Sequence, residues 1–379
     1  MTHSVPTRVS RRKVLKSTSA AALSVLAAPA LISQARSSSG ELNVLMWSDY
    51  LPKRFLSAFR DQTGIKVNHS PIGSNEALME KMKASGGAGY DLACPSSHRN
   101  LQWAPLGLLQ PFDLSRVPVD SLNPGMAKIG SNGWNFENKG PHWLPFLWGT
   151  EGIAWRTDKW TPKDSVPSYG DIWAEENAGQ TMGRAHSMML GAGLYLETIG
   201  ELEPGAVWAA YESPEKMKPV WETISKWCIA RKKVIKVLWD GAETQKAALL
   251  TGEVALGQTW DGPPIALKNT GAPVMYQAPK EGALTWVDGV AISAGAKNID
   301  QIYEFLKFAF TPQNAGEAIL THGYNSPVKT ADQFAGEVYI KNFGEAYPGD
   351  ALSNLNTWPS EPPWYAALRA EYVALFLAA

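Results

Sequence analysis

The sequence is poor in the residues that most often mark disulfides, metal sites and membrane spans. Its 379 residues include two cysteines, Cys94 and Cys228, and six histidines that are scattered without a zinc-like spacing. We therefore expect two buried, unpaired thiols and neither a metal ion nor another cofactor. After the N-terminal region no run of about 18 apolar residues occurs, so we expect a soluble mature protein.

The sequence also lacks an excess of charge and the motifs of common enzymes. Lys and Arg number 35 against 36 Asp and Glu, a net charge of −1 that argues against nucleic acid as a partner. It contains no Gly-x-Ser-x-Gly, His-Glu-x-x-His or P-loop motif, which argues against an enzyme. Tryptophan, in contrast, is abundant. Its 16 residues exceed what a core usually needs, and indole suits places where an apolar wall meets a polar or cationic group.

The N-terminus has the pattern of an export signal. Ser10-Arg11-Arg12-Lys13-Val14-Leu15-Lys16 precedes a moderately apolar run and then small residues. This order resembles a twin-arginine signal, and we predict a signal peptide over residues 1–35 that is removed on export. Because no lipobox cysteine follows, we expect the mature protein to be free in the periplasm.

The mature chain begins with alternating strands and helices. Short apolar strands are expected near residues 42–47, 65–67 and 90–94, with helices opened by Pro52 and Ser74 between them. This alternation predicts a parallel, doubly wound sheet, in which ligands bind beyond the carboxyl ends of the strands. Two longer apolar segments, 144–155 and 284–292, are expected to cross between two lobes.

Several motifs occur in the order known from one family. The chain resembles the periplasmic spermidine/putrescine-binding proteins of ABC importers over essentially its whole mature length. The matching motifs are Trp47-Ser48-Asp49-Tyr50, Ser74-Asn75-Glu76, Tyr90-Asp91-Leu92, Pro95-Ser96, Trp148-Gly149, Trp260-x-Gly262, Trp286-x-Asp288, Ala296-Lys297-Asn298 and Gly323-Tyr324-x-x-Pro327.

The resemblance implies an α/β, two-lobed periplasmic binding protein of class II. Each lobe would be a doubly wound sheet, with the ligand cleft at the hinge. Lobe 1 is predicted over residues 41–149 with 287–322, and lobe 2 over 150–286 with 323–379. The implied partners are a small cationic ligand and an inner-membrane ABC permease with its cytoplasmic ATPase, and we expect a monomer.

The resemblance also implies a set of ligand-binding residues. Trp260 and Trp286 would form walls along the ligand, and Asp288 would pair with an ammonium group. Trp47, Ser48, Asp49 and Tyr50 match a loop that faces the cleft in the family. An alternative for Asp49 is a capping role at the helix opened by Pro52.

Further contacts are expected from Ser96, through its hydroxyl group, and from Tyr324 near the hinge. His98 stands where family members place Tyr, and its alternative is a loop histidine that faces solvent. Glu151 and Asp261 are two acids that could replace carboxylates missing elsewhere, although Glu151 could equally be a hinge residue on the solvent side.

One stretch departs from the family. Residues 181–190 contain no carboxylate where the family has acids, and Arg184 or His186 could instead receive a carboxylate of the ligand. We therefore expect a cation with fewer charges than spermidine, such as putrescine or a related amine. A quaternary ammonium, guanidino or amino-acid-like ligand is the alternative on the same fold, and a folded enzyme exported by the twin-arginine route is the alternative of another class.

Overall fold

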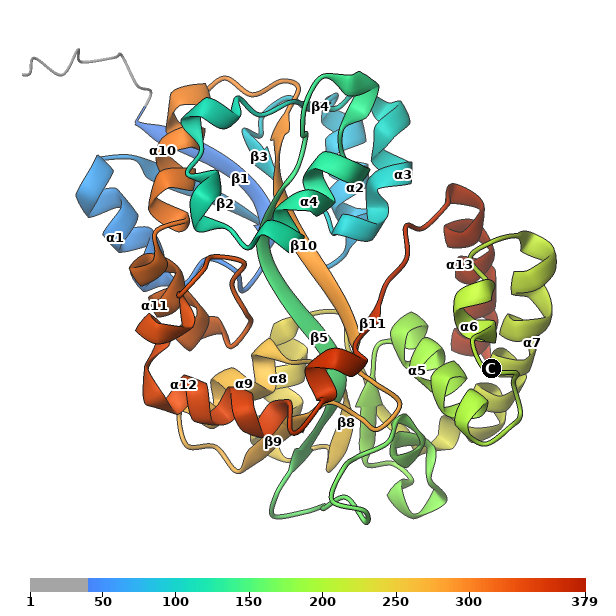
Figure 1. Cartoon of the computed structure of the whole chain (residues 1–379). Helices are drawn as coiled ribbons and strands as arrows, with labels where there is room; N and C mark the ends of the chain where they lie inside the picture. The colour runs from blue at the N-terminus through green and yellow to red at the C-terminus, as the bar shows by residue number, and fades with distance from the viewer. Residues whose placement is uncertain (1–39) are drawn as a thin grey trace, which may run out of the picture. The chain divides into compact units, whose positions relative to one another are not determined.

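The computed structural model describes residues 40–379, so the predicted signal peptide lies outside the described residues (Figure 1). Its strands form one mixed sheet with the path β2-β1-β3-β10-β5-β8-β6-β7, and β4, β9 and β11 pair with strands of this path. The bounds are β1 Glu41–Trp47, β2 Lys66–Ile72, β3 Leu92–Ala93, β4 Leu109–Gln110, β5 Leu144–Arg156, β6 Thr181–Gly183, β7 Ile235–Leu238, β8 Leu256–Trp260, β9 Val274–Gln277, β10 Leu284–Ser293 and β11 Asn356–Thr357.

Two groups of parallel strands lie at the two ends of this path. β1 pairs in parallel with β2 and β3, and β6 pairs in parallel with β7 and β8. The parallel pairing predicted for the first three strands is confirmed. Parallel strands need crossover connections, and helices supply them here.

The two groups are joined by β5 and β10, the strands predicted to cross between lobes. The first part of β10 pairs antiparallel with β5, and its last residues pair with β3 and β4. The second half of β5 pairs with β8 and β9. Figure 1 shows β5 and β10 running together through the middle of the fold.

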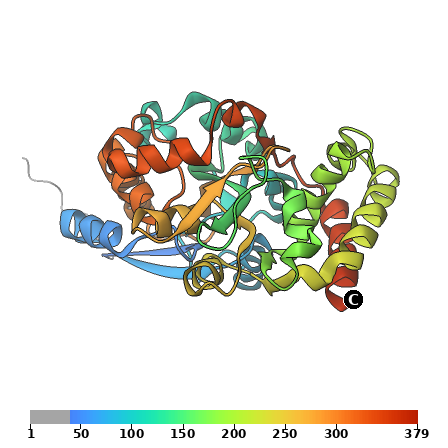
Figure 2. The same cartoon turned by 90° about the horizontal axis from the view of Figure 1, so that it is seen from below.

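The helices cover the two groups of strands. α13 packs against α7 and α5, which Figures 1 and 2 show beside it, and α10 packs against α1 and α11. The bounds are α1 Lys53–Thr63, α2 Asn75–Ser85, α3 Asn100–Trp103, α4 Pro124–Gly133, α5 Ala185–Thr198, α6 Ala206–Ala209, α7 Pro214–Arg231, α8 Ala242–Thr251, α9 Gly262–Asn269, α10 Ile299–Ala309, α11 Pro312–His322, α12 Asp332–Ala346 and α13 Pro363–Ala378.

Local sequence explains where the first helices begin and end. Pro52 precedes α1, and Gly64 ends it in the left-handed conformation. The Ser74 side chain accepts a hydrogen bond from Ala77 N at 3.1 Å, which caps α2 as its sequence predicts. Both cysteines are buried and free, as expected. Among residues 40–379 no helix is long and apolar enough to cross a membrane.

Gly289 allows β10 to pass close to Trp143. The register between β10 and β5 shifts between Asp288 and Gly289, and a Cβ atom at 289 would lie 2.0 Å from Cε2 of Trp143. No side chain fits there unless the strand or the indole moves. The glycine therefore fixes the backbone directly after Asp288.

We expect Gly289→Ala to lower the free energy of unfolding by about 3 kcal/mol, because the added methyl overpacks a buried contact. Urea unfolding followed by circular dichroism measures the change. Gly344→Ala is the matched control, because Gly344 lies in α12 with open space at its Cβ position. The control should be neutral or stabilising by up to about 1 kcal/mol. Equal effects of the two substitutions would contradict this account of Gly289.

Candidate functional site

A cavity of about 40 Å³ lies where the strand ends of the two groups meet. Trp47 ends β1, Ser96 and His98 follow β3, Trp260 ends β8, and β10 contributes two residues. The full lining is Trp47, Tyr50, Asn75, Glu76, Ser96, His98, Arg99, Arg184, His186, Trp260, Trp286, Asp288 and Trp358.

Four indoles line the cavity, and those of Trp47, Trp260 and Trp286 lie side by side. The ring centroids of Trp47 and Trp260 lie 5.9 Å apart, edge to face, and those of Trp260 and Trp286 lie 6.3 Å apart. Trp47 Nε1 donates to the Cys94 carbonyl oxygen at 3.1 Å, which fixes that ring. Rings held in this way offer π faces to a cation and apolar surface to methylene groups.

Trp286 has room because its neighbour on β5 is glycine. Gly149 lies opposite Trp286 in the register of the two strands, and a Cβ at 149 would lie 2.9 Å from Cζ2 of the indole. The glycine of the Trp148-Gly149 motif therefore leaves space for the indole of Trp286, which forms part of the cavity wall.

Asp288 is the carboxylate of the cavity that has no cationic partner among the described residues. It is 1% exposed, and its Oδ2 accepts a hydrogen bond from the Tyr50 hydroxyl at 2.5 Å. Its Oδ1 is buried and has no hydrogen-bond partner within residues 40–379. Burial raises the pKa of Asp288 to about 6, against the lowering effect of nearby Ser96, Tyr50 and Trp286. A buried oxygen without a donor is the feature that a bound ammonium group would satisfy.

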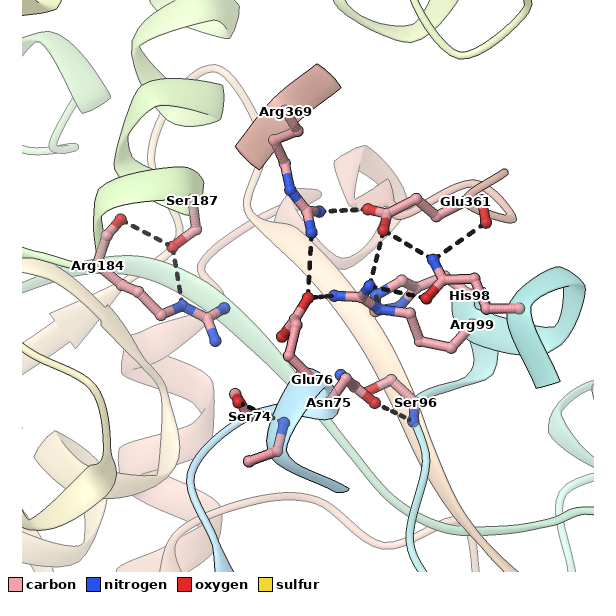
Figure 3. A network of polar contacts seen from close by, with 12 residues as sticks. Ser74, Asn75, Glu76, Ser96, His98, Arg99, Arg184, Ser187, Glu361 and Arg369 are labelled. Carbon is pink, nitrogen blue, oxygen red and sulfur yellow. Dashed lines mark hydrogen bonds and ion pairs between the residues drawn. The ribbon is translucent and has the colours of Figure 1, made fainter. Parts of the chain in front are cut away.

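Four other charges beside the cavity neutralise one another (Figure 3). Arg99 donates to Glu76 at 2.8 Å and to Glu361 at 2.7 Å. Arg369 pairs with the same two carboxylates. Although burial opposes it, the positive charge of Arg99 and then Arg369 lowers the pKa of Glu76 to about 2. We call these four residues the ionic network.

The ionic network ties the C-terminal segment to the loop after β3. The backbone N–H of Glu361 donates to the His98 carbonyl oxygen at 2.7 Å, and the His98 ring stacks on Trp358 with centroids 5.5 Å apart. Burial, followed by the positive charge of Arg99, keeps the pKa of His98 well below its usual value. His98 is therefore neutral at pH 7 and forms part of the wall.

Arg184 is the remaining cation of the lining. It precedes α5, and Figure 3 shows it held by Ser187, with Nε donating to Ser187 Oγ at 3.3 Å. Its Nη2 lies 3.4 Å from Oε2 of Glu151, and its guanidinium carbon lies 5.1 Å from the Trp260 ring centroid. Both hydrogen bonds are long.

Seven of the twelve residues expected from sequence line the cavity: Trp47, Tyr50, Ser96, His98, Trp260, Trp286 and Asp288. The other five lie outside the lining. Ser48 is exposed, and Asp49 has a buried Oδ2 that meets no hydrogen-bond partner in the described part of the chain. Glu151 is fully buried and accepts from Gln258 Nε2 at 3.0 Å.

Asp261 and Tyr324 are also buried away from the cavity. Asp261 accepts hydrogen bonds from Asn325 Nδ2 at 2.9 Å and from the Tyr347 hydroxyl at 2.7 Å. The Tyr324 ring packs edge to face on Tyr50 with centroids 5.2 Å apart. Tyr324 thus packs against Tyr50, the residue that donates to Asp288.

Sequence reasoning did not propose Asn75, Glu76, Arg99 and Trp358 as site residues. Asn75 and Glu76 lie within one of the family motifs, and Trp358 lies in a segment rich in Trp and Pro, so all three carry a signal in the sequence. Arg99 carried none, because its partner Glu361 is 262 residues away.

The two groups of strands, the crossing strands and the cavity at the strand ends define a binding protein that holds a solute between two lobes. Residues 55–343 match the family of bacterial extracellular solute-binding proteins. The spermidine/putrescine-binding periplasmic protein 1 of Haemophilus influenzae is 30% identical over 286 residues, 73% of this chain and 72% of that protein. The spermidine/putrescine-binding periplasmic protein of Escherichia coli K12 is 27% identical over 330 residues, 86% of this chain and 88% of that protein.

A solved structure of a spermidine/putrescine ABC transporter protein from Listeria monocytogenes superposes with a TM-score of 0.73. It shares 23% identity and covers 89% of this chain and 99% of that chain. This chain belongs to the bacterial extracellular solute-binding proteins, in the family of the spermidine/putrescine-binding periplasmic proteins. The predicted two-lobed α/β fold is confirmed, and the lobe boundaries given from sequence stay a prediction.

We expect Glu361→Gln to lower the free energy of unfolding by about 3 kcal/mol, because it leaves the buried Arg99 and Arg369 with a single carboxylate between them. Urea unfolding measures the loss. The control is Glu175→Gln, which removes an exposed ion pair with Lys233 and should change stability by less than about 1 kcal/mol. A loss no larger than that of the control would show that the ionic network contributes nothing to stability.

Proposed function

We propose that this protein captures a small organic cation in the periplasm and delivers it to an ABC permease of the inner membrane. The observation that carries the proposal is Asp288, a buried carboxylate without a cationic partner among the described residues, set among the indoles of Trp47, Trp260 and Trp286. An ammonium group would pair with the carboxylate, and the indoles would cover the methylene groups. The names of the relatives, which specify spermidine and putrescine, support a ligand of this class.

The charge balance of the cavity favours a ligand with few positive charges. The ionic network contains two cations and two anions, and Arg184 faces Glu151. Asp288 is left as the one lining carboxylate without a cation among the described residues. Spermidine, with three amines, would bring more charge than this cavity neutralises.

Binding would be coupled to closure of the two lobes. Trp47 belongs to the first group of strands, Ser96 to the loop after β3 of that group, and Trp260 to the second group. A ligand that contacts all three therefore favours the closed arrangement. In this proposal the protein acts as a monomer and performs no chemistry on its ligand. It is exported by the twin-arginine route, and residues 1–35 are removed.

We expect Asp288→Asn and Trp286→Ala each to weaken binding of the preferred amine at least tenfold. The first change removes the charge that pairs with the ammonium group, and the second removes one wall. Isothermal titration calorimetry of the mature protein against putrescine, spermidine, choline-like amines and guanidino compounds measures the affinities. Asp158→Asn, a change at an exposed carboxylate that pairs with Arg156 and does not line the cavity, should leave them unaltered. Binding of an anion alone, with no affinity for any cation, would refute the proposed function.

The pKa of about 6 at Asp288 predicts how binding depends on pH. An ammonium ligand pairs with the ionised carboxylate, so affinity should be highest above pH 6 and fall about tenfold between pH 7.5 and pH 5. The ligand-free protein should show the opposite trend in stability. A raised pKa in the folded state stabilises it at low pH, and this contribution is lost as the pH rises through 6.

Calorimetry at pH 5, 6 and 7.5 tests the affinity, and thermal unfolding without ligand tests the stability. Asp288→Asn should weaken both pH dependences. An affinity that stays constant over this range in the unaltered protein would show that Asp288 does not pair with the ligand.

A further inference from the structure

The cavity contains a second charged group whose hydrogen-bonding capacity is only partly used. The Arg184 guanidinium has five N–H groups, and only Nε and Nη2 donate to atoms of the described residues, at 3.3 and 3.4 Å. Its side chain keeps 19% of its surface exposed and lines the cavity. Unused guanidinium donors at the wall of a narrow site are suited to a planar anion such as a carboxylate.

Glu151 fixes Arg184 without enclosing it. Glu151 is buried beneath the wall, where one of its oxygens accepts from Gln258 and the other faces Arg184 Nη2. Gln258 also donates to the Ser187 carbonyl oxygen at 2.8 Å, which attaches this cluster to the first turn of α5. Glu151 is thus a positioning residue for Arg184, and Nη1 donates to no atom within residues 40–379.

The surroundings of Arg184 disfavour a second ammonium group. The guanidinium carbon lies 5.1 Å from the ring centroid of Trp260 and 5.2 Å from that of Trp239, so the chain itself supplies a cation to this indole pair. Arg184 also precedes the first turn of α5, which has no side-chain cap. The positive end of a 14-residue helix dipole adds to the charge of the guanidinium.

Asp288 and Arg184 line the same cavity but form no ion pair with each other. We propose that the ligand is a short amino-carboxylate zwitterion, with its ammonium group on Asp288 and its carboxylate on Arg184. This assignment rests on the proposed function, because it keeps the ammonium site at Asp288 and defines the other end of the ligand. A diamine of the same length would place its second ammonium against Arg184.

The test compares ligands of equal length that differ only in their end groups. The mature, ligand-free protein is titrated calorimetrically with 4-aminobutanoate, 1,4-diaminobutane, butylamine and butanoate. The amino acids and diamines of three, five and six carbons are titrated next. We expect the best amino acid of the series to bind at least tenfold more tightly than the best diamine and than butylamine, and butanoate alone to bind more weakly still.

Substitution of Arg184 tests the assignment of the carboxylate. Arg184→Gln should weaken binding of the amino acid at least tenfold and leave that of the diamine equal or stronger, which reverses the preference. Arg184→Lys keeps the charge but not the planar fork, and should weaken the amino acid alone, to a smaller degree. The matched control is Arg231→Gln, since Arg231 stacks on Trp227 at 4.0 Å and does not line the cavity.

Thermal unfolding of each variant shows whether it folds. The ratio of the affinity for the amino acid to that for the diamine, measured on one variant, does not depend on the fraction of that protein that is active. A diamine that binds more tightly than every amino acid, with a ratio unchanged by Arg184→Gln, would overturn the zwitterion and leave the proposed function intact. Absence of binding by every amine and amino acid, or binding of butanoate alone, would overturn both.

Discussion

Burial of charge where the two groups of strands meet is the constraint on which this site depends. A carboxylate or guanidinium removed from water costs several kcal/mol unless a partner compensates it. Within the ionic network each buried charge has partners of opposite sign, whereas Arg184 has only Glu151 among the described residues, at 3.4 Å. Asp288 accepts a hydrogen bond from the Tyr50 hydroxyl, and its negative charge remains available to pair with a ligand in the cavity. The charges that are paired within the chain do not select a ligand. The specificity of the site therefore depends on the charged groups that still lack a full set of partners.

The framework that carries these charges is built from β5 and β10. Each strand pairs with the other over part of its length and with a different group of strands over the rest. Asp288 and Trp286 lie on β10 at this junction, and Gly149 and Glu151 lie on β5. Any change in the angle between the two groups would therefore alter the geometry of the site directly.

The sequence could predict the fold well because its signals are local or follow from a resemblance. Ser74 caps α2, Gly64 ends α1, and the apolar segments 144–155 and 284–292 become the two crossing strands. The aromatic walls and Asp288 were also accessible, since Trp286-x-Asp288 is a compact motif. The ionic network was not, because Arg99 and Glu361 meet only through the tertiary path of the C-terminal segment.

Glu151 shows a different limit of sequence reasoning. The sequence places it on a crossing strand and leaves two alternatives, a contact with the ligand or a hinge residue on the solvent side. The structure shows neither, because Glu151 is fully buried and lies outside the lining. The register with β8 places Glu151 opposite Trp260, and Gln258 then binds its side chain beneath the wall. Successive side chains of a strand point to opposite faces of the sheet. A shift of one residue therefore determines whether a side chain contacts the ligand or supports another residue that contacts it.

The C-terminal segment completes the site. The cavity takes residues from Trp47 in β1 to Trp358 next to β11, and Glu361 completes the charge balance beside it. A chain truncated before Trp358 would keep the other walls but would lose this indole and the carboxylate that faces Arg99 and Arg369. The segment that carries Trp358 and Glu361 must therefore be packed in place before the cavity can hold a ligand.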